Sequence, residues 1–212
     1  MQLPEYLSVA GPGSDLIVVK RSKFIGHAAP AESEAEAMEF IAKISDEHKT
    51  ATHNVWAYQI GEQDQWQRYS DDGEPSGTAG VPTLEVLKQM GLKNTVVVVT
   101  RYFGGTLLGA SGLVRAYSRG AKVGIEAAGV VRKVLHNRIQ ITVDYSTSGK
   151  MENELHGYDQ LILEPVSYTD RVTFSGLVPP ARLGGLETLV QELTGGQSHV
   201  EVLGSEYVDF PV

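Results

Sequence analysis

The sequence predicts an α+β protein of two domains, residues 1–133 and residues 134–212. The first part combines a valine-rich strand with a glycine-rich turn and a long helix, and the second shows a β-α-β-β-α-β order. Charge also changes between the parts. Residues 1–133 carry 14 Lys+Arg and 15 Asp+Glu, a net charge of −1, whereas residues 134–212 carry 4 and 11, a net charge of −7. An anionic partner is therefore expected to meet the first domain.

The first domain is expected to begin with two strands, a basic turn and a capped helix. The strands span residues 15–20 and 24–29 on either side of the turn Lys20-Arg21-Ser22-Lys23. Ser33 and Glu36 form a capping-box pattern, which predicts a helix that runs to about residue 48. The apolar face of this helix is predicted to consist of Met38, Ile41, Ala42 and Ile44.

The rest of the first domain centres on a strand with four consecutive valines. A strand over residues 54–60, a polar loop over residues 68–80 and a short helix from Pro82 to about residue 91 come first. The valines at residues 96–99 then predict a strand, residues 94–100, that is buried on both faces. A long helix follows, and Gly129 is expected to end it.

The second domain is expected to have a ferredoxin-like fold. The predicted elements are a strand over residues 136–145, a helix from Ser146 or Thr147 to about residue 158, strands over residues 160–167 and 171–178, a helix over residues 181–194 and a strand over residues 199–208. Their β-α-β-β-α-β order is that of the split βαβ motif.

The segment after the valine strand is the strongest candidate for a binding site. Gly104, Gly105 and Gly109 let the backbone approach a ligand, and the start of the helix around Ser111 favours an anion. The segment is neither a Walker A loop nor a G-x-G-x-x-G motif. A purely structural role, in which the glycines permit contact between helix and sheet, stays open.

Basic residues flank the same segment. Arg101 is expected to leave the strand at the glycine-rich turn, while Arg115, Arg119 and Lys122 share one helical face. These side chains could contact a phosphate backbone or an acidic partner, or they could simply be solvated.

Two further segments carry groups capable of acid–base chemistry. Asp71, Asp72 and Glu74 lie in a Gly- and Ser-rich loop, and His53 lies at the mouth of a strand. The loop lacks the spacing of a calcium hand, and no histidine–carboxylate spacing accompanies it, so no metal and no cofactor are expected. A catalytic triad of Ser111, His53 and Asp72 is rejected because Ser111 does not lie in a G-x-S-x-G elbow.

Composition narrows the possible classes of protein. The chain has no cysteine, which excludes disulfides, thiolate zinc sites and a cysteine nucleophile. The N-terminal residues do not form a secretory signal, and the longest apolar run has the length of a strand. We therefore expect a cytoplasmic protein with no membrane contact. Its net charge of −8 argues against a general nucleic-acid coat protein, and no sequence-specific DNA binding is expected.

Four segments together resemble the IMPACT family, and within it the bacterial YigZ-like members. They are RSKFIG at residues 21–26, THNVWAY at residues 52–58, SDDGEPSGTAG at residues 70–80, and TRYFGG at residues 100–105 with LGASGLVRAY at residues 108–117. The resemblance implies a first domain like domain IV of elongation factor G and like the second domain of a small-subunit ribosomal protein. It also implies a ferredoxin-like second domain like domain V of that factor.

The resemblance also implies a role near translation, since eukaryotic relatives regulate translation through protein–protein contact. We expect a non-catalytic binding or regulatory protein whose partner is RNA, the ribosome or a protein of the translation machinery. The groups expected to face that partner are Lys20, Arg21, Lys23, Arg101, Arg115 and Arg119. One alternative is an enzyme that holds a phosphorylated small molecule at residues 104–112 and uses His53, Asp72 or Glu74. A pure protein–protein interaction module is the other.

Overall fold

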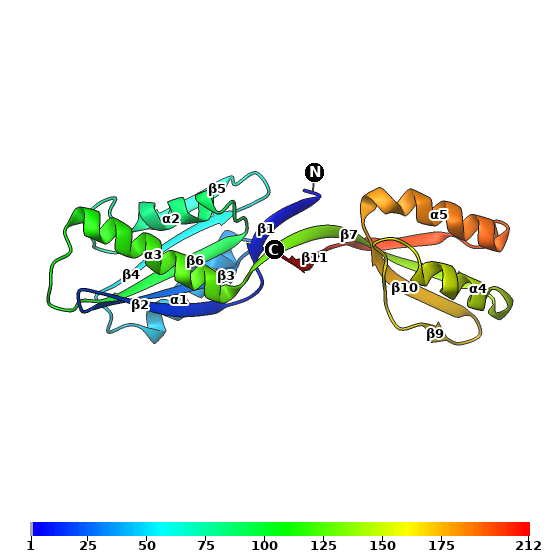
Figure 1. Ribbon diagram of the computed structural model, residues 1–212, viewed down its shortest axis with the longest axis horizontal. Coiled ribbons are helices and arrows are strands. Elements are labelled where there is room, and N and C mark those ends of the chain that lie inside the picture. The colour runs from blue at the N-terminus through cyan, green and yellow to red at the C-terminus, as the bar shows by residue number, and fades with distance from the viewer. Residues whose placement is uncertain (1) are drawn as a thin grey trace. The chain divides into compact units, whose positions relative to one another are not determined.

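The computed structural model describes residues 2–212, which form two compact units (Figure 1). One unit is the chain up to Lys133 together with Asp209–Val212, and the other is Val134–Val208. Both contain helices and antiparallel strands, so the predicted α+β class is confirmed. Within the described residues, every helix is too short or too polar to cross a membrane.

The first unit is built on a five-stranded antiparallel sheet in the order β2-β3-β6-β4-β5. Its strands are β2 (Gly13–Val19), β3 (Ser22–Pro30), β4 (His53–Ile60), β5 (Trp66–Ser70) and β6 (Thr95–Tyr102). The central strand β6 contains the four valines, all with no exposed surface. The prediction of a strand buried on both faces is therefore confirmed.

Helices cover both faces of this sheet. They are α1 (Glu34–Glu47), α2 (Gly80–Gln89) and α3 (Ala110–Ala128). Side chains alternate along a strand, so Val97 and Val99 pack with α2 and α3 on one face, while Val96 and Val98 pack with α1 on the other.

Glycines set the distance between α3 and the sheet. A Cβ atom added at Gly26 of β3 would lie 1.9 Å from the backbone oxygen of Gly120, and one added at Gly124 would lie 2.5 Å from the carbonyl carbon of Gly26. Helix and strand can approach this closely only because none of the three residues has a side chain.

The capping-box prediction for α1 is confirmed. The Ser33 hydroxyl accepts from the Glu36 backbone N–H at 3.2 Å, and the Glu36 carboxylate accepts from the Glu32 N–H at 2.9 Å. The predicted inward face is partly wrong, because Met38 is 47% exposed and Ala42 is also exposed. The buried positions of the helix are Ala37, Ile41 and Ile44.

Two strands of the first unit were not expected. One is β1 (Glu5–Val9), which pairs with β7 (Val130–Val143) and makes a parallel bridge from Leu7 to Leu92. The other is β5, which forms the sheet edge from residues assigned partly to the polar loop.

The second unit shows the predicted β-α-β-β-α-β order, with the second strand split in two. After β7 come α4 (Tyr145–His156), β8 (Ile162–Leu163), β9 (Ser167–Tyr168), β10 (Val172–Val178), α5 (Pro180–Thr194) and β11 (Val200–Pro211). β10 pairs with β7, β8 and β9, and β11 pairs with β7. The helices contribute Met151, Leu155, Leu186 and Val190 to a separate core. Neither Ser146 nor Thr147 caps α4, whose N-cap position is Asp144.

Candidate functional site

A pocket of about 420 Å³ opens in the first unit, where β4 and β6 approach the start of α3. Its polar lining comes from Thr52, His53, Glu74 and Arg101, and its apolar lining from Pro75, Phe103, Leu107, Leu108 and Leu113. Gly109 and Ala110, at the beginning of α3, complete it. We call this cavity the Arg101 pocket.

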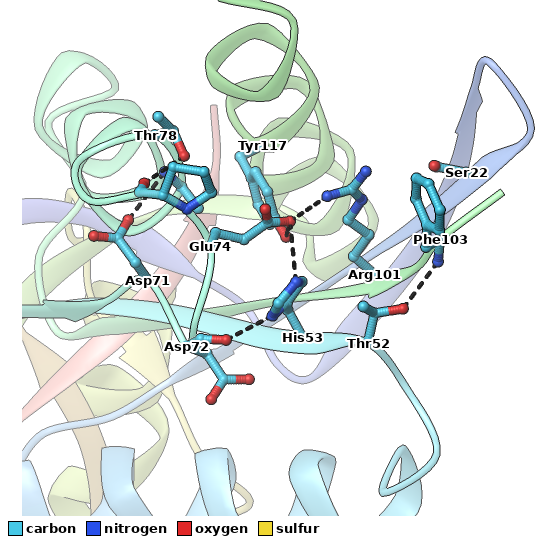
Figure 2. A network of polar contacts seen from close by, with 12 residues as sticks. Ser22, Thr52, His53, Asp71, Asp72, Glu74, Thr78, Arg101, Phe103 and Tyr117 are labelled. Carbon is cyan, nitrogen blue, oxygen red and sulfur yellow. Dashed lines mark hydrogen bonds and ion pairs between the residues drawn. The ribbon is translucent and has the colours of Figure 1, made fainter. Parts of the chain in front are cut away.

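A buried ion pair forms part of the pocket wall. Arg101 is 5% exposed and Glu74 is 8% exposed, and the Nη1 atom of Arg101 lies 2.5 Å from the Oε1 atom of Glu74. Tyr117 of α3 donates its hydroxyl to the same oxygen at 2.7 Å (Figure 2). Burial, and next the bond to Glu74, raises the pKa of the Tyr117 hydroxyl, so this group stays protonated and acts as a donor.

Arg101 does not leave the sheet at the turn, so that prediction is wrong. β6 continues to Tyr102, and Arg101 lies on the α3 side of the sheet with Val97 and Val99. Its guanidinium carbon is 5.4 Å from the ring centre of Phe24 and 5.5 Å from that of Phe103. Arg101 is therefore part of the interior and not of an exposed basic surface.

His53 faces the same cluster from the neighbouring strand, since it pairs in register with Arg101. Its Nδ1 atom lies 2.6 Å from the backbone oxygen of Asp72, which can only accept, so Nδ1 carries a hydrogen. In the neutral ring Nε2 is then an acceptor, and it lies 3.8 Å from the Oε1 atom of Glu74. Asp72 thus orients His53 through its backbone oxygen. Its carboxylate accepts from the Asn54 N–H at 2.6 Å and does not line the pocket.

The acidic loop is shaped by its own hydrogen bonds. The Asp71 carboxylate accepts from the backbone N–H groups of Gly77, Ala79 and Gly80 at 2.8–3.1 Å, which fixes the loop and the start of α2. Thr78 donates to the carbonyl of Pro75. Among the described residues, no three His, Asp or Glu side chains are grouped so that they could hold a metal ion.

The glycines of the glycine-rich segment have different roles. A Cβ atom at Gly104 would lie 2.1 Å from the backbone of Arg21, so Gly104 lets this segment pack on the turn between β2 and β3. Gly105 and Gly109 have positive φ angles of 81° and 70°. Gly104 therefore has a structural role, whereas Gly109 belongs to the pocket lining. Ser111 is exposed in the first turn of α3.

Five of the predicted basic residues lie on the surface of the first unit. Lys20, Arg115 and Arg119 line a shallow hollow of about 200 Å³ that we call the basic groove, together with Val19, Leu108, Gly112 and Ala116. Arg21 and Lys23 are exposed on the same hairpin as Lys20. Within residues 2–212 none of the five makes an ion pair. Lys122 lies 3.8 Å from Glu126.

Sequence reasoning missed residues that line the pocket and one, Tyr117, that holds the Glu74 side chain of its wall. Tyr117 was not considered, although it lies on the apolar stripe of α3 and a buried tyrosine hydroxyl needs a partner. Phe103 and Leu107 were also missed, and no spacing rule points to loop side chains of this kind.

Comparison with known proteins gives matches in both units. The model of the Impact N-terminal domain matches residues 20–125, and the model of a domain of unknown function, DUF1949, matches residues 141–197. A solved structure titled only as that of a hypothetical protein is 28% identical, with a TM-score of 0.61. The match covers 95% of this chain and 98% of that chain.

Two bacterial proteins match along nearly their whole lengths. The IMPACT family member YigZ of Escherichia coli is 30% identical, with 92% of this chain and 96% of that protein covered. The IMPACT family member YvyE of Bacillus subtilis is 45% identical over 199 residues, with 94% of this chain and 91% of that protein covered. Since the match to YvyE extends through both units and the N-terminal family model spans the pocket and the groove, the chain belongs to the IMPACT family.

Proposed function

We propose that this protein is a cytoplasmic, non-catalytic binding protein linked to translation, and that it contacts RNA or the ribosome through the basic groove. The link to translation comes from the family resemblance, which also suggests likenesses of the two units to domains IV and V of elongation factor G. A protein of the translation machinery is a further candidate partner. The groove supplies the physical basis for contact with an anion.

The observation that carries the proposal is the set of exposed cations without carboxylate partners. Lys20, Arg115 and Arg119 come from two different elements and converge on one hollow, with Arg21 and Lys23 on the same hairpin as Lys20. Helix α3 contains a single acidic residue, Glu126, close to its C-terminal end. Cations that are held together without counter-charges attract phosphates, whose neutralisation dominates the affinity of proteins for nucleic acids.

The negative net charge of the second unit supports contact with the anion through the first unit. The second unit, Val134–Val208, carries 4 Lys+Arg and 10 Asp+Glu, a net charge of −6, so it would be repelled by a polyanion that the first unit attracts. Arg138 and Arg171 of this unit are already paired with carboxylates. The charge pattern therefore favours contact through one unit only.

Binding to ribosomes and RNA across a series of salt concentrations tests the proposal. The test variant is Arg115→Glu with Arg119→Glu in the basic groove. Lys43→Glu with Lys49→Glu is its matched control, because the net charge changes equally but both lysines lie in or directly after α1 on the other face of the sheet. We expect wild type and control to bind at low salt and to weaken steeply as salt rises.

The groove variant is expected to lose at least tenfold in affinity at low salt while keeping its stability. Absence of binding by wild type at low salt would refute the proposal. Equal losses in the groove variant and the α1 control would show that net charge matters and that the groove does not.

A second candidate is an enzyme that acts on a phosphorylated small molecule. The Arg101 pocket favours it because ionisable side chains are gathered there. The pocket gathers His53, Glu74 and Arg101, whereas Asp72 is directed to the Asn54 amide. Turnover of phosphorylated metabolites by wild type and its loss in His53→Ala would support this candidate. A protein–protein module without RNA contact would instead leave a partner bound after the charge reversal at Arg115 and Arg119.

A further inference from the structure

We infer that the Arg101 pocket receives the base of an unpaired nucleotide while the adjoining phosphates lie on the first turn of α3 and in the basic groove. The inference rests on the proposed function, because it specifies which part of an RNA the first unit holds. Pocket and groove are neighbours: Leu108 lines both, and at the start of α3 Gly109 and Ala110 line the pocket while Gly112 lines the groove. An extended ligand can therefore occupy both.

The polar wall of the pocket is better suited to N–H donors than to an anion. The charges of Arg101 and Glu74 offset each other in their buried pair. The Oε2 atom of Glu74 makes no hydrogen bond within the described chain, so this carboxylate oxygen is available to accept one. Nucleobases carry N–H groups on their edges, whereas a phosphate offers mainly acceptors and would be repelled by the carboxylate.

The remaining walls suit a flat aromatic group. Phe103 is 46% exposed and Leu107 is 82% exposed, although both are large and apolar, and Pro75 and Leu113 line the same cavity. Unpaired bases stack on aromatic side chains and on arginine planes, and Arg101 lies against the Phe103 ring. A volume of about 420 Å³ lies within the range of about 300–1,000 Å³ of small-molecule sites.

Arg101 holds a buried hydrogen-bond donor, its Nε atom, in the wall of this cavity. Its side chain is buried to more than nine-tenths, it lines the pocket, and its Nε atom has no hydrogen-bond partner among residues 2–212. A buried donor without a partner costs about 1–3 kcal/mol, so a ligand atom that accepts from it would relieve that cost. The carbonyl oxygens and ring nitrogens of nucleobases are such acceptors.

The positive features lie at the helix start and in the groove, where phosphates of the same strand would lie. Gly109 is the N-cap of α3 and provides no side-chain cap, so the N–H groups of residues 110–112 are available to an anion. Lys20, Arg115 and Arg119 continue this positive region along the groove. The N–H groups of a base would meet the acceptor in the pocket. The phosphates of the same nucleotide strand would meet the cations beside the pocket.

Filling the pocket without touching its polar wall tests this inference. Ala110→Leu adds bulk at the pocket lining, and Ala127→Leu adds the same bulk at an exposed position near the other end of α3. Each protein is titrated with a short single-stranded RNA, with the same sequence as a duplex, and with free nucleoside 5′-monophosphates. Circular dichroism confirms that both variants are folded.

We expect wild type to prefer the single strand to the duplex about tenfold, because only unpaired bases can enter the pocket. Ala110→Leu is expected to lose about tenfold in affinity for the single strand, with an unchanged affinity for the duplex and an unchanged dependence on salt. Ala127→Leu is expected to bind like wild type. Phe103→Ala, which removes the stacking surface, gives a second variant with the same expected loss.

The possible outcomes separate this inference from the proposed function. Equal binding of single strand and duplex, or equal binding by wild type and Ala110→Leu, overturns the nucleotide pocket. If Arg115→Glu with Arg119→Glu still abolishes RNA binding, the proposed function survives that result. Binding of free monophosphates alone, sensitive to Ala110→Leu, would support the pocket with a free nucleotide as ligand and refute the RNA contact.

Discussion

Arg101 and Arg115 belong to the same stretch of sequence but have different environments. Arg101 lies in β6, is 5% exposed, and pairs with Glu74 between two aromatic rings. Arg115 lies on the outer face of α3, where its Nε atom donates only to the Ser111 carbonyl of the same helix, at 3.3 Å. A cation in a strand that is covered on both faces needs a counter-charge, whereas a cation on an outer helix face stays available to a partner.

Arg101 and Arg115 therefore have different roles, although the sequence suggests that they belong to one surface. The buried pair of Arg101 and Glu74 forms part of the wall of a pocket, and the exposed groove residues are those that we propose to contact an anion. His27 is a third case, because it is a buried basic side chain without a counter-charge. Substitutions in the three environments therefore have different expected effects on stability and binding.

The largest expected effect is on the buried pair. Arg101→Met or Glu74→Met alone leaves one buried charge without its partner and is expected to lower the free energy of unfolding by about 3–5 kcal/mol. The combination of both substitutions should recover much of this loss, because no charge is then left unpaired. Urea denaturation of the four proteins in a double-mutant cycle measures the coupling. Additive losses would contradict the assignment of a coupled buried pair.

A somewhat smaller effect is expected at His27. Burial, and next the proximity of His48, lowers the pKa of His27 to about 4. The unfolded chain therefore binds a proton between about pH 6.5 and pH 4 that the folded chain does not bind, so stability falls as pH falls through this window, by up to ~3 kcal/mol. His27→Leu is expected to reduce that loss. If the free energy of unfolding falls equally with pH in wild type and in His27→Leu, His27 is not responsible for the loss.

The smallest effect is expected at the hairpin between β2 and β3. Lys20 and Arg21 have positive φ angles of 45° and 69° in a two-residue turn, a conformation in which Asn-Gly is preferred. Lys20→Asn with Arg21→Gly is expected to raise the free energy of unfolding by about 1 kcal/mol and to weaken RNA binding. Thermal melts and binding titrations measure the two effects. A variant that is less stable, or that binds RNA as well as wild type, would contradict this expectation.

The fold could be predicted where local patterns were strong. The valines at residues 96–99, the Ser33 capping box and the glycine at the end of α3 are local signals, and each occurs where expected. β5 was missed because it is an edge strand whose side chains are largely exposed, so it lacks the alternation of a half-buried strand.

The site could be predicted only in part, because the direction of side chains depends on tertiary structure. The segments around His53, Glu74, Arg101 and Gly109 were identified as candidates, and these residues do line one pocket. A strand buried on both faces gives no alternation to show which way Arg101 points. The pairing of Glu74 with Arg101 and Tyr117 joins three separate elements, and no sequence spacing predicts such a contact.

The most direct test of the account is the salt dependence of RNA affinity after the loss of one cation from each environment. Arg115→Met removes a groove cation, and Arg101→Met with Glu74→Met removes the buried pair without leaving a lone charge. Arg115→Met is expected to reduce the magnitude of the negative slope of log affinity against log salt by about 1, while the double variant is expected to leave this slope unchanged. A reduced slope in the double variant together with an unchanged slope in Arg115→Met would contradict the account.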